Sequence, residues 1–454
     1  MAEEWDGGNG TYRAPFGRGS LTFALPPVVA SLDVIAARTP APLPDLSAAV
    51  TSALACPLGA PRLRDLATSA SLRRERSVVR SVEPRPDMQV CLVFTDATRA
   101  CPDEVLASAL LAELHAAGIP DANITLLCAT GLHRASTLAE KIAKLGADIV
   151  ARCRVVDHDA QQDMVSLGQT EHGIPLTINR LAAAADLLIA TGVVEPHQYA
   201  GFSGGSKIVA VGIAGEPTIA FTHGPTMLDQ PGVRLGNLQG NPFQAAVREA
   251  GRRARLQFVL NVVLDGGGRV LAVAAGAPDA VHDHLAAAAH AASVVHAAHP
   301  YDAIIAGVGF PKDQNFYQAS RAATYVGLVE RPALAAGGVI ILPAPCPEGI
   351  GAGTGEQRFA DLMRAGADRP AHLLAEMRAH GFPPGGQRAF MLAQLLERFR
   401  LAVVGCETPA ALAACHVRTA ASIEDALTWA ADQVGHSLRV AFVPHALTTV
   451  LTLA

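Results

Sequence analysis

The sequence predicts an α/β protein made of two Rossmann-like α/β domains, with mainly parallel sheets and an active-site cleft between the domains. From about residue 88, short apolar runs alternate with longer amphipathic stretches rich in alanine and leucine. Strands that are apolar throughout and separated by helices are typical of parallel sheets covered on both faces. The alternation restarts near residue 300, so the chain divides into two such halves.

The first half contains the more regular part of this alternation. We expect strands at Val90–Thr95, Ile124–Ala129 and Ala185–Val194, and helices at Asp103–Ala117 and Thr137–Leu145. Residues 1–87 lack a clear period, and we expect them to wrap around this half.

The second half follows an alanine- and histidine-rich helix expected at Asp279–Ala298. Its expected strands are Ala303–Val308, Gly338–Pro343, Leu401–Val404 and Leu438–Val443. Its expected helices are Asn315–Val329, Gln387–Arg398 and Ile423–Val434. We therefore expect an N-terminal cofactor-binding domain over residues 1–275, a connecting helical segment over 276–300 and a C-terminal α/β domain over 301–454.

Composition excludes several classes of protein. The net charge is −5 with no block of like charge, so neither nucleic acid nor a membrane surface is expected as a partner. The eight cysteines form no CxxC pair, which favours reduced thiols over disulfides or structural zinc. The acidic start is unlike a secretory signal, and Leu181–Val194 is too short to span a bilayer. We expect a cytoplasmic protein.

Polar clusters follow the expected strands, at the edge where ligands bind in α/β sheets. Asp96 and Arg99 follow the first strand, Gly131–Arg134 the second, Glu195–Lys207 the third, and Pro311–Gln318 the first strand of the second half. These clusters are expected to converge on one cleft. Asp96 and Arg99 could also simply pair with each other, since they are three residues apart.

The cluster Glu195–Lys207 is a glycine-rich turn that ends in a lysine. Gly204 and Gly205 would let the backbone approach a ligand closely. The phosphate-binding pattern GxxxxGK[ST] is not met, because Ser206 intervenes. A turn ending in a solvated lysine is the plainer interpretation.

Histidines and one helix supply further candidates. His133, His197 and His223 lie in or after turns, although an isolated histidine is more often structural than catalytic. The histidines of the expected helix Asp279–Ala298 indicate a solvated face rather than a metal site. Tyr317 and Arg321 are one helical turn apart, with a surface ion pair as the plain alternative for Arg321.

Several motifs together resemble those of the nickel-dependent lactate racemase family, in the same order and over about residues 18–450. The motifs are FTDATR, ATGLHR, GVVEPHQYAGFSGGSKIVAVGIAGEPTI, FTHG, LQGNP, FVLNVVLD, PKDQNFYQASRA and CPEGIG. The resemblance implies a nickel-pincer nucleotide, a pyridinium-3-thioamide-5-thiocarboxylic acid mononucleotide that holds nickel. Lys207 matches the lysine that carries this cofactor covalently, and His223 matches the nickel ligand. His133 and His197 match the two acid/base histidines.

The resemblance also implies a reaction, the racemisation or epimerisation of a 2-hydroxy acid. Reversible hydride transfer to the cofactor would give a 2-oxo acid, which can be reduced on either face. Arg99, Arg321, Tyr317 and Gln318 would bind and orient the substrate. Asp96 would order Arg99 or contact the cofactor. The backbone of Gly204 and Gly205 would also contact the cofactor.

One residue departs from the family pattern. Arg321 stands where the lactate enzymes of the family carry a lysine, so a substrate other than lactate is plausible. The alternatives are a sugar-acid 2-epimerase of the same family and a non-catalytic nickel or cofactor carrier. A carrier would need only Lys207 and His223, so the presence of both His133 and His197 argues against it. An ordinary nicotinamide dehydrogenase is disfavoured, because no GxGxxG follows the first strand. The expected partners are a small 2-hydroxy acid and the cofactor-biosynthesis enzymes.

Overall fold

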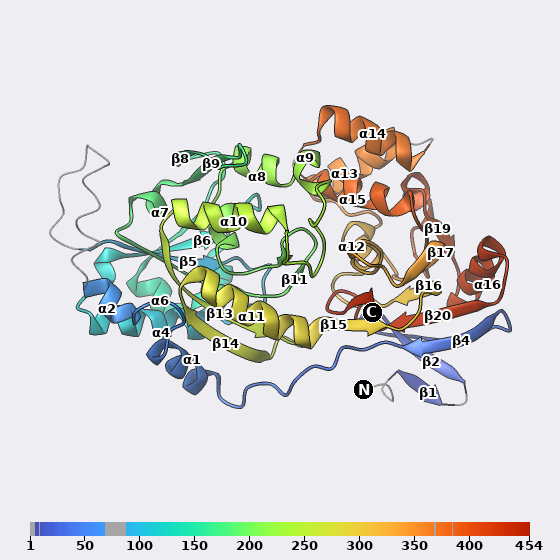
Figure 1. Cartoon of the computed structure of the whole chain (residues 1–454), viewed down its shortest axis with the longest axis horizontal. Helices are drawn as coiled ribbons and strands as arrows, with labels where there is room; N and C mark the ends of the chain where they lie inside the picture. Colours follow the sequence, from blue (N-terminus) through green and yellow to red (C-terminus); the bar gives the residue numbers. More distant parts are fainter. Residues whose placement is uncertain (1–4, 9, 69–87, 367–368, 384) are drawn as a thin grey trace.

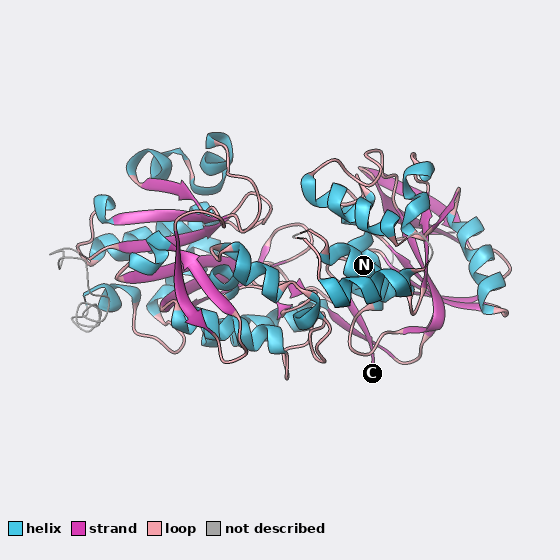
Figure 2. Ribbon diagram, turned by 90° about the horizontal axis from the view of Figure 1, so that it is seen from above, coloured by secondary structure: helices cyan, strands magenta, loops and turns pink. Residues whose placement is uncertain are grey.

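Two six-stranded sheets, each flanked by helices, form the frame of the molecule (Figures 1 and 2). The computed structural model describes residues 5–8, 10–68, 88–366, 369–383 and 385–454. The predicted α/β class with mainly parallel sheets is confirmed, since only β13 and β14 pair antiparallel within the two large sheets.

The first sheet, in spatial order, consists of β14 (Val270–Gly276), β13 (Leu256–Leu264), β10 (Leu187–Val193), β5 (Val90–Thr95), β6 (Ile124–Ala129) and β7 (Arg154–Asp157). Helices of this half are α1 (Leu46–Ala55), α2 (Leu63–Thr68), α4 (Asp103–Ala116), α5 (Leu138–Leu145), α6 (Ala147–Arg152), α7 (Arg180–Ala184), α8 (Glu216–Thr222), α9 (Pro225–Leu228), α10 (Pro242–Arg253) and α11 (Pro278–Ser293). Two small hairpins, β8 (Met164–Gln169) with β9 (Pro175–Asn179) and β11 (Pro196–His197) with β12 (Gly201–Phe202), lie outside the sheet.

The second sheet consists of β19 (Arg418–Ala420), β18 (Arg400–Val404), β17 (Leu334–Pro343), β16 (Tyr301–Ala306), β20 (Leu438–Val443) and β4 (Val29–Val34). Its helices are α12 (Phe316–Gly327), α13 (Thr354–Ala365), α14 (Pro370–His380), α15 (Gln387–Leu396) and α16 (Ile423–Val434). Helices α13 and α14 were not predicted from the sequence. The hydrophobic positions of α14 are less regular than those of α12 and α16, so periodicity gave a weak signal for this helix.

The N-terminal segment lies elsewhere than expected. Residues 1–87 were expected to wrap around the first half, but β4 pairs in parallel with β20 at the edge of the second sheet. The small sheet of β1 (Asp6–Gly8), β2 (Thr11–Phe16) and β3 (Gly19–Ala24) packs beside it, and a long connection then crosses to α1 (Figure 1). Helices α1 and α2 pack on the first half as expected. Residues 69–87 lie outside the described residues.

The segment between the halves is also shorter as a helix than predicted. Helix α11 ends at Ser293, and the chain continues as β15 (Val294–Ala297). This strand pairs in parallel with β21 (Val450–Leu453), so the C-terminal end of the chain is held against the connection. These residues form a strand rather than the end of the helix because they pair with residues more than 150 positions away. Local periodicity does not reveal such a distant contact.

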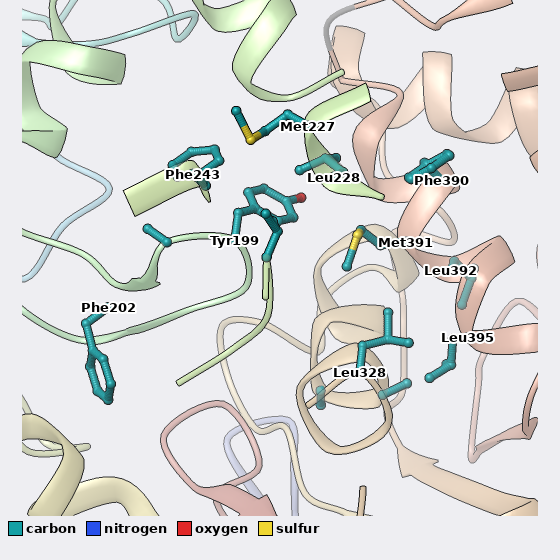
Figure 3. Packing of buried hydrophobic residues seen from close by; sticks show 14 of the residues in the cluster. Tyr199, Phe202, Met227, Leu228, Phe243, Leu328, Phe390, Met391, Leu392 and Leu395 are labelled. Atoms are coloured by element: carbon teal, nitrogen blue, oxygen red, sulfur yellow. The ribbon is translucent and has the colours of Figure 1, made fainter. Parts of the chain in front are cut away.

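A continuous hydrophobic core joins the two halves. One cluster of buried residues contains side chains of both sheets and of the helices between them. Figure 3 shows Tyr199, Phe243 and Leu228 of the first half on one side of this cluster, with Phe390 and Met391 of α15 on the other. This shared packing holds the loops of the first half opposite α12 and α15.

Candidate active site

A cavity of about 520 Å³ lies between the ends of the first sheet's strands and the helices α12 and α15. Cavities of this size commonly hold small molecules. It is lined by all the residues that the sequence singled out: Asp96, Arg99, His133, His197, Gly204, Gly205, Lys207, His223, Tyr317, Gln318 and Arg321.

Topology explains why these residues meet. Strands β5, β6 and β10 are neighbours and run parallel, so their carboxyl ends share one edge of the sheet. Asp96 directly follows β5, His133 follows β6, and His197 follows β10. The residues that follow these three strands therefore form one wall of the cavity, the first-half wall. Lys207, in the turn after β12, also lies on this wall.

His133 is held by a carboxylate. Its Nδ1 lies 2.7 Å from Oδ2 of Asp96, and the Thr98 hydroxyl donates to the other oxygen of Asp96 at 2.7 Å. Burial alone would raise the pKa of Asp96, but the hydrogen bonds from His133 and Thr98 lower it below its usual value. The charged carboxylate therefore keeps a hydrogen on Nδ1, which leaves the Nε2 lone pair of His133 available to accept a proton.

His197 has the opposite arrangement. Its Nδ1 accepts hydrogen bonds from the backbone N–H groups of Tyr199 and Ala200, at 3.3 and 3.2 Å. The neutral ring therefore carries its hydrogen on Nε2. Burial lowers the pKa of His197 well below its usual value, with further lowering by the positive charges of Lys207 and Arg99.

Lys207 is a buried amine. Burial lowers its pKa to about 7, with Arg99 lowering it further and Glu195 acting in the opposite direction. A neutral amine is a nucleophile, and a pKa of about 7 leaves part of this lysine neutral at neutral pH. The plainer interpretation, a solvated lysine at the end of a turn, is wrong.

The two glycines before Lys207 have a packing role of their own. Both have a left-handed backbone, with φ of +83° at Gly204 and +52° at Gly205. A Cβ on Gly204 would lie 2.5 Å from the Val194 side chain, and one on Gly205 would lie 2.9 Å from Cβ of His282. His282 is only 1 % exposed, so the expectation of a fully solvated histidine face on this helix is wrong.

His223 caps the C-terminal end of α8. Its Nδ1 lies 3.2 Å from the carbonyl oxygen of Ile219, which accepts a hydrogen bond and leaves Nε2 without a hydrogen. Burial, and then the charge of Lys207, lowers its pKa to about 3. A neutral imidazole oriented through its other nitrogen is the usual form of a metal ligand. In the described ranges, no three His, Cys, Asp or Glu residues are grouped to hold a metal by themselves.

Arg99 pairs with a residue that the sequence did not single out as its partner. Its Nη1 lies 2.6 Å from Oε1 of Glu195, whereas the hydrogen bonds of Asp96 go to His133 and Thr98. The expected pairing of Asp96 with Arg99 is therefore replaced by two separate pairs. Both pairs lie on the first-half wall of the cavity.

The opposite wall comes from the second half. Tyr317 and Arg321 line the cavity from α12, and Arg321 donates to the Tyr325 hydroxyl at 3.4 Å. Arg321 is half-buried and forms no ion pair with any residue of the described ranges, so it is not in a surface ion pair. Sequence reasoning missed two other cations on this wall, Lys312 and Arg388. Lys312 lies inside the motif PKDQNFYQASRA, whereas Arg388 lies in a helix without any motif.

Models of two domain families match the chain. The lactate racemase N-terminal domain matches residues 16–236, and the lactate racemase C-terminal domain matches residues 296–451. The lactate racemase of Lactiplantibacillus plantarum is 33 % identical over 364 residues, which cover 79 % of this chain and 84 % of that protein. This chain belongs to the lactate racemase family. Its members are isomerases, and a second lactate racemase, from Thermoanaerobacterium thermosaccharolyticum, is 33 % identical over 78 % of each chain.

Solved structures agree with this membership. The lactate racemase apoprotein of T. thermosaccharolyticum superposes with a TM-score of 0.83 at 28 % identity, covering 97 % of this chain and 99 % of that one. A protein from Thermotoga maritima superposes with a TM-score of 0.60 at 17 % identity, over 87 % of this chain and 100 % of that one, a likeness of fold alone. No helix in the described part of this family member is long and apolar enough to cross a membrane.

Proposed function

We propose that this isomerase racemises or epimerises a 2-hydroxy acid with a nickel-pincer nucleotide bound in the cavity between the two halves. The observation that carries the proposal is the joint placement of four groups around one cavity: an amine with a pKa of about 7, an imidazole with a free Nε2, and two further histidines. In this assignment, the part of residues 1–275 that builds the first half binds the cofactor and residues 301–454 close the cavity, with 276–300 between them; strand β4 belongs to the second sheet.

The residues present fit the proposed cofactor. Lys207 has the neutral amine that a thioamide link requires, and His223 offers one nitrogen to nickel while its other nitrogen is held by a carbonyl. A metal held by one histidine needs its remaining donors from a cofactor, because the described residues offer no larger group of ligands. When bound, the nucleotide supplies a reversible hydride acceptor.

The chain's own residues then transfer the proton and bind the substrate. Oxidation of the substrate at C2 would release the hydroxyl proton, which a histidine of the chain takes up, while the nucleotide would supply the acceptor for the C2 hydrogen and its electron pair. Nε2 of His133 accepts the proton, and the Asp96 carboxylate stabilises the imidazolium that forms. Return of a proton to the oxygen, when the planar 2-oxo acid is reduced on its other face, would complete the inversion at C2.

His197 is proposed to handle the opposite stereoisomer. For its Nε2 to accept a proton, the hydrogen must move to Nδ1 and the two backbone contacts on that atom must open. Arg99 and Arg321 bind the substrate carboxylate from the two walls, while Tyr317 and Gln318 orient the substrate.

The test is to load the chain and measure its product. Co-expression with the cofactor-biosynthesis enzymes should give a covalent mass increment, one bound nickel per chain and racemisation of a 2-hydroxy acid. Racemisation without nickel or mass increment would exclude the cofactor assignment. A loaded chain inactive on every 2-hydroxy acid and sugar acid would instead favour the carrier, which is otherwise disfavoured because both His133 and His197 line the cavity.

A further inference from the structure

Three cations of the second half face the cavity without a carboxylate partner. Lys312 follows β16, Arg321 lies on α12 and Arg388 lies on α15, and all three line the cavity. Within the described residues, none of them forms an ion pair. The polar contacts of the two arginines go to neutral groups: Arg321 to the Tyr325 hydroxyl at 3.4 Å, and Arg388 to Oε1 of Gln198 at 3.3 Å.

These cations are poorly satisfied by the protein. The Nε atoms of Arg321 and Arg388 are buried without a hydrogen-bond partner. Burial, followed by the charge of Arg321, lowers the pKa of the Arg388 guanidinium, and the same two causes lower the pKa of Lys312. Like charges gathered in a half-buried wall cost free energy unless an anion offsets them. Of the carboxylates on this side of the cavity, Glu195 pairs with Arg99, and Glu356 bonds to Asn315 and the backbone of Gly353. A bound anion would therefore give these cations the carboxylate partner that they lack.

The two arginines have different neighbours in the cavity. Arg321 and Arg99 both lower the pKa values of His197 and Lys207, so both lie close to the reacting centre. The Arg388 guanidinium instead lies 5.4 Å from the Tyr317 ring centroid and contacts Gln198. A monocarboxylate bound by Arg99 and Arg321 would leave Arg388 and Lys312 unbalanced.

We propose that the substrate is a 2-hydroxy dicarboxylic acid, such as malate, whose second carboxylate binds Arg388 with help from Lys312. This inference rests on the proposed function and names the substrate class of the same site. A planar carboxylate fits the fork of a guanidinium, and the pair is desolvated in the cavity. Lactate ends in a methyl group at C3, where malate continues to its second carboxylate.

The first test is binding to the full-length chain without cofactor, measured by titration calorimetry with malate and with lactate. Malate should bind about tenfold or more tightly than lactate, the effect expected of one further charge-assisted pair. Arg388→Met should abolish this preference. The matched control is Arg398→Met, because Arg398 is exposed just beyond the end of the same helix and outside the cavity. Equal binding of malate and lactate by the native chain would overturn the proposal, whether or not the variant folds.

The second test uses the loaded enzyme. Arg388→Met should lower kcat/KM for malate about tenfold or more, and change that for lactate less than about threefold. Arg388→Lys, which keeps the charge, should restore part of the malate activity. Loss of the covalent mass increment in Arg388→Met would assign Arg388 to the cofactor's phosphate and overturn the proposal. Racemisation of lactate but not malate by the native enzyme would overturn it while leaving the proposed function standing.

Discussion

The two walls of the cavity differ in how their charges are balanced. On the first-half wall, charged groups are paired within the protein: His133 with Asp96 and Arg99 with Glu195. On the second-half wall, Lys312, Arg321 and Arg388 have no such partner among the residues described. Paired groups hold a fixed geometry before any ligand arrives, whereas unpaired cations gain a partner only when an anion binds. In the proposed function, the acid/base groups are therefore preorganised on one wall, and the proposed selection of the substrate is concentrated on the other.

The largest effect is expected for Lys207→Ala, which tests whether the first-half wall carries the cofactor. The variant should lose the covalent mass increment and all racemisation, because no other amine on that wall can form the link. Its melting temperature should stay near the native value, since burial of this amine does not stabilise the fold. Intact-protein mass spectrometry and calorimetry measure both. Lys141→Ala, which breaks a 2.6 Å ion pair with Asp157 away from the cavity, serves as the control and should keep its cofactor.

His133→Ala and His197→Ala should each lower kcat about 100-fold or more while nickel remains bound, the range expected for loss of an acid/base group. His223→Ala should instead lose nickel, measured by elemental analysis. Because two enantiomers have equal free energy, kcat/KM is the same in both directions for a racemase. The different hydrogen bonding of the two histidines should therefore appear as unequal kcat values for the two enantiomers. Native activity in the His197 variant would contradict the two-histidine mechanism.

Arg321→Lys probes the second wall. The variant keeps the charge but loses the guanidinium fork, so kcat/KM should fall about tenfold and the ranking of 2-hydroxy acids should change. Rates for lactate, malate, 2-hydroxybutyrate and gluconate provide the measurement. An unchanged ranking with unchanged rates would mean that Arg321 does not touch the substrate.

The smallest effect is a shift in pH dependence. Since the pKa of Lys207 is about 7, its amine should be acylated by a small reagent with a half-maximal rate near pH 7. A free lysine amine, which titrates near 10.4, should react only at higher pH. Arg99→Met removes a charge that lowers this pKa, so the midpoint should rise, whereas Glu195→Gln should lower it. Peptide mass mapping across pH gives the midpoints, and identical midpoints in all three proteins would contradict this account.

The sequence predicted the first wall better than the second. Strands such as Val90–Thr95 are apolar throughout, a local signal, and parallel topology then brings the residues after each strand to one edge. Arg388 carries no such signal, because nothing local distinguishes a cavity arginine from a surface one. Its position depends on packing between helices distant in sequence, such as the contact of α12 with α15.

The pairing of β4 with β20 has a consequence for how the chain is made. Residues 29–34 are made more than 400 residues before their partner strand at residues 438–443. The second sheet can therefore close only after β20 has been made, although the first half can fold earlier. Until then β4 remains an open strand edge, a template for pairing with another chain. The second wall of the cavity is therefore completed only after β20 has emerged and paired with β4, however early the first wall has folded.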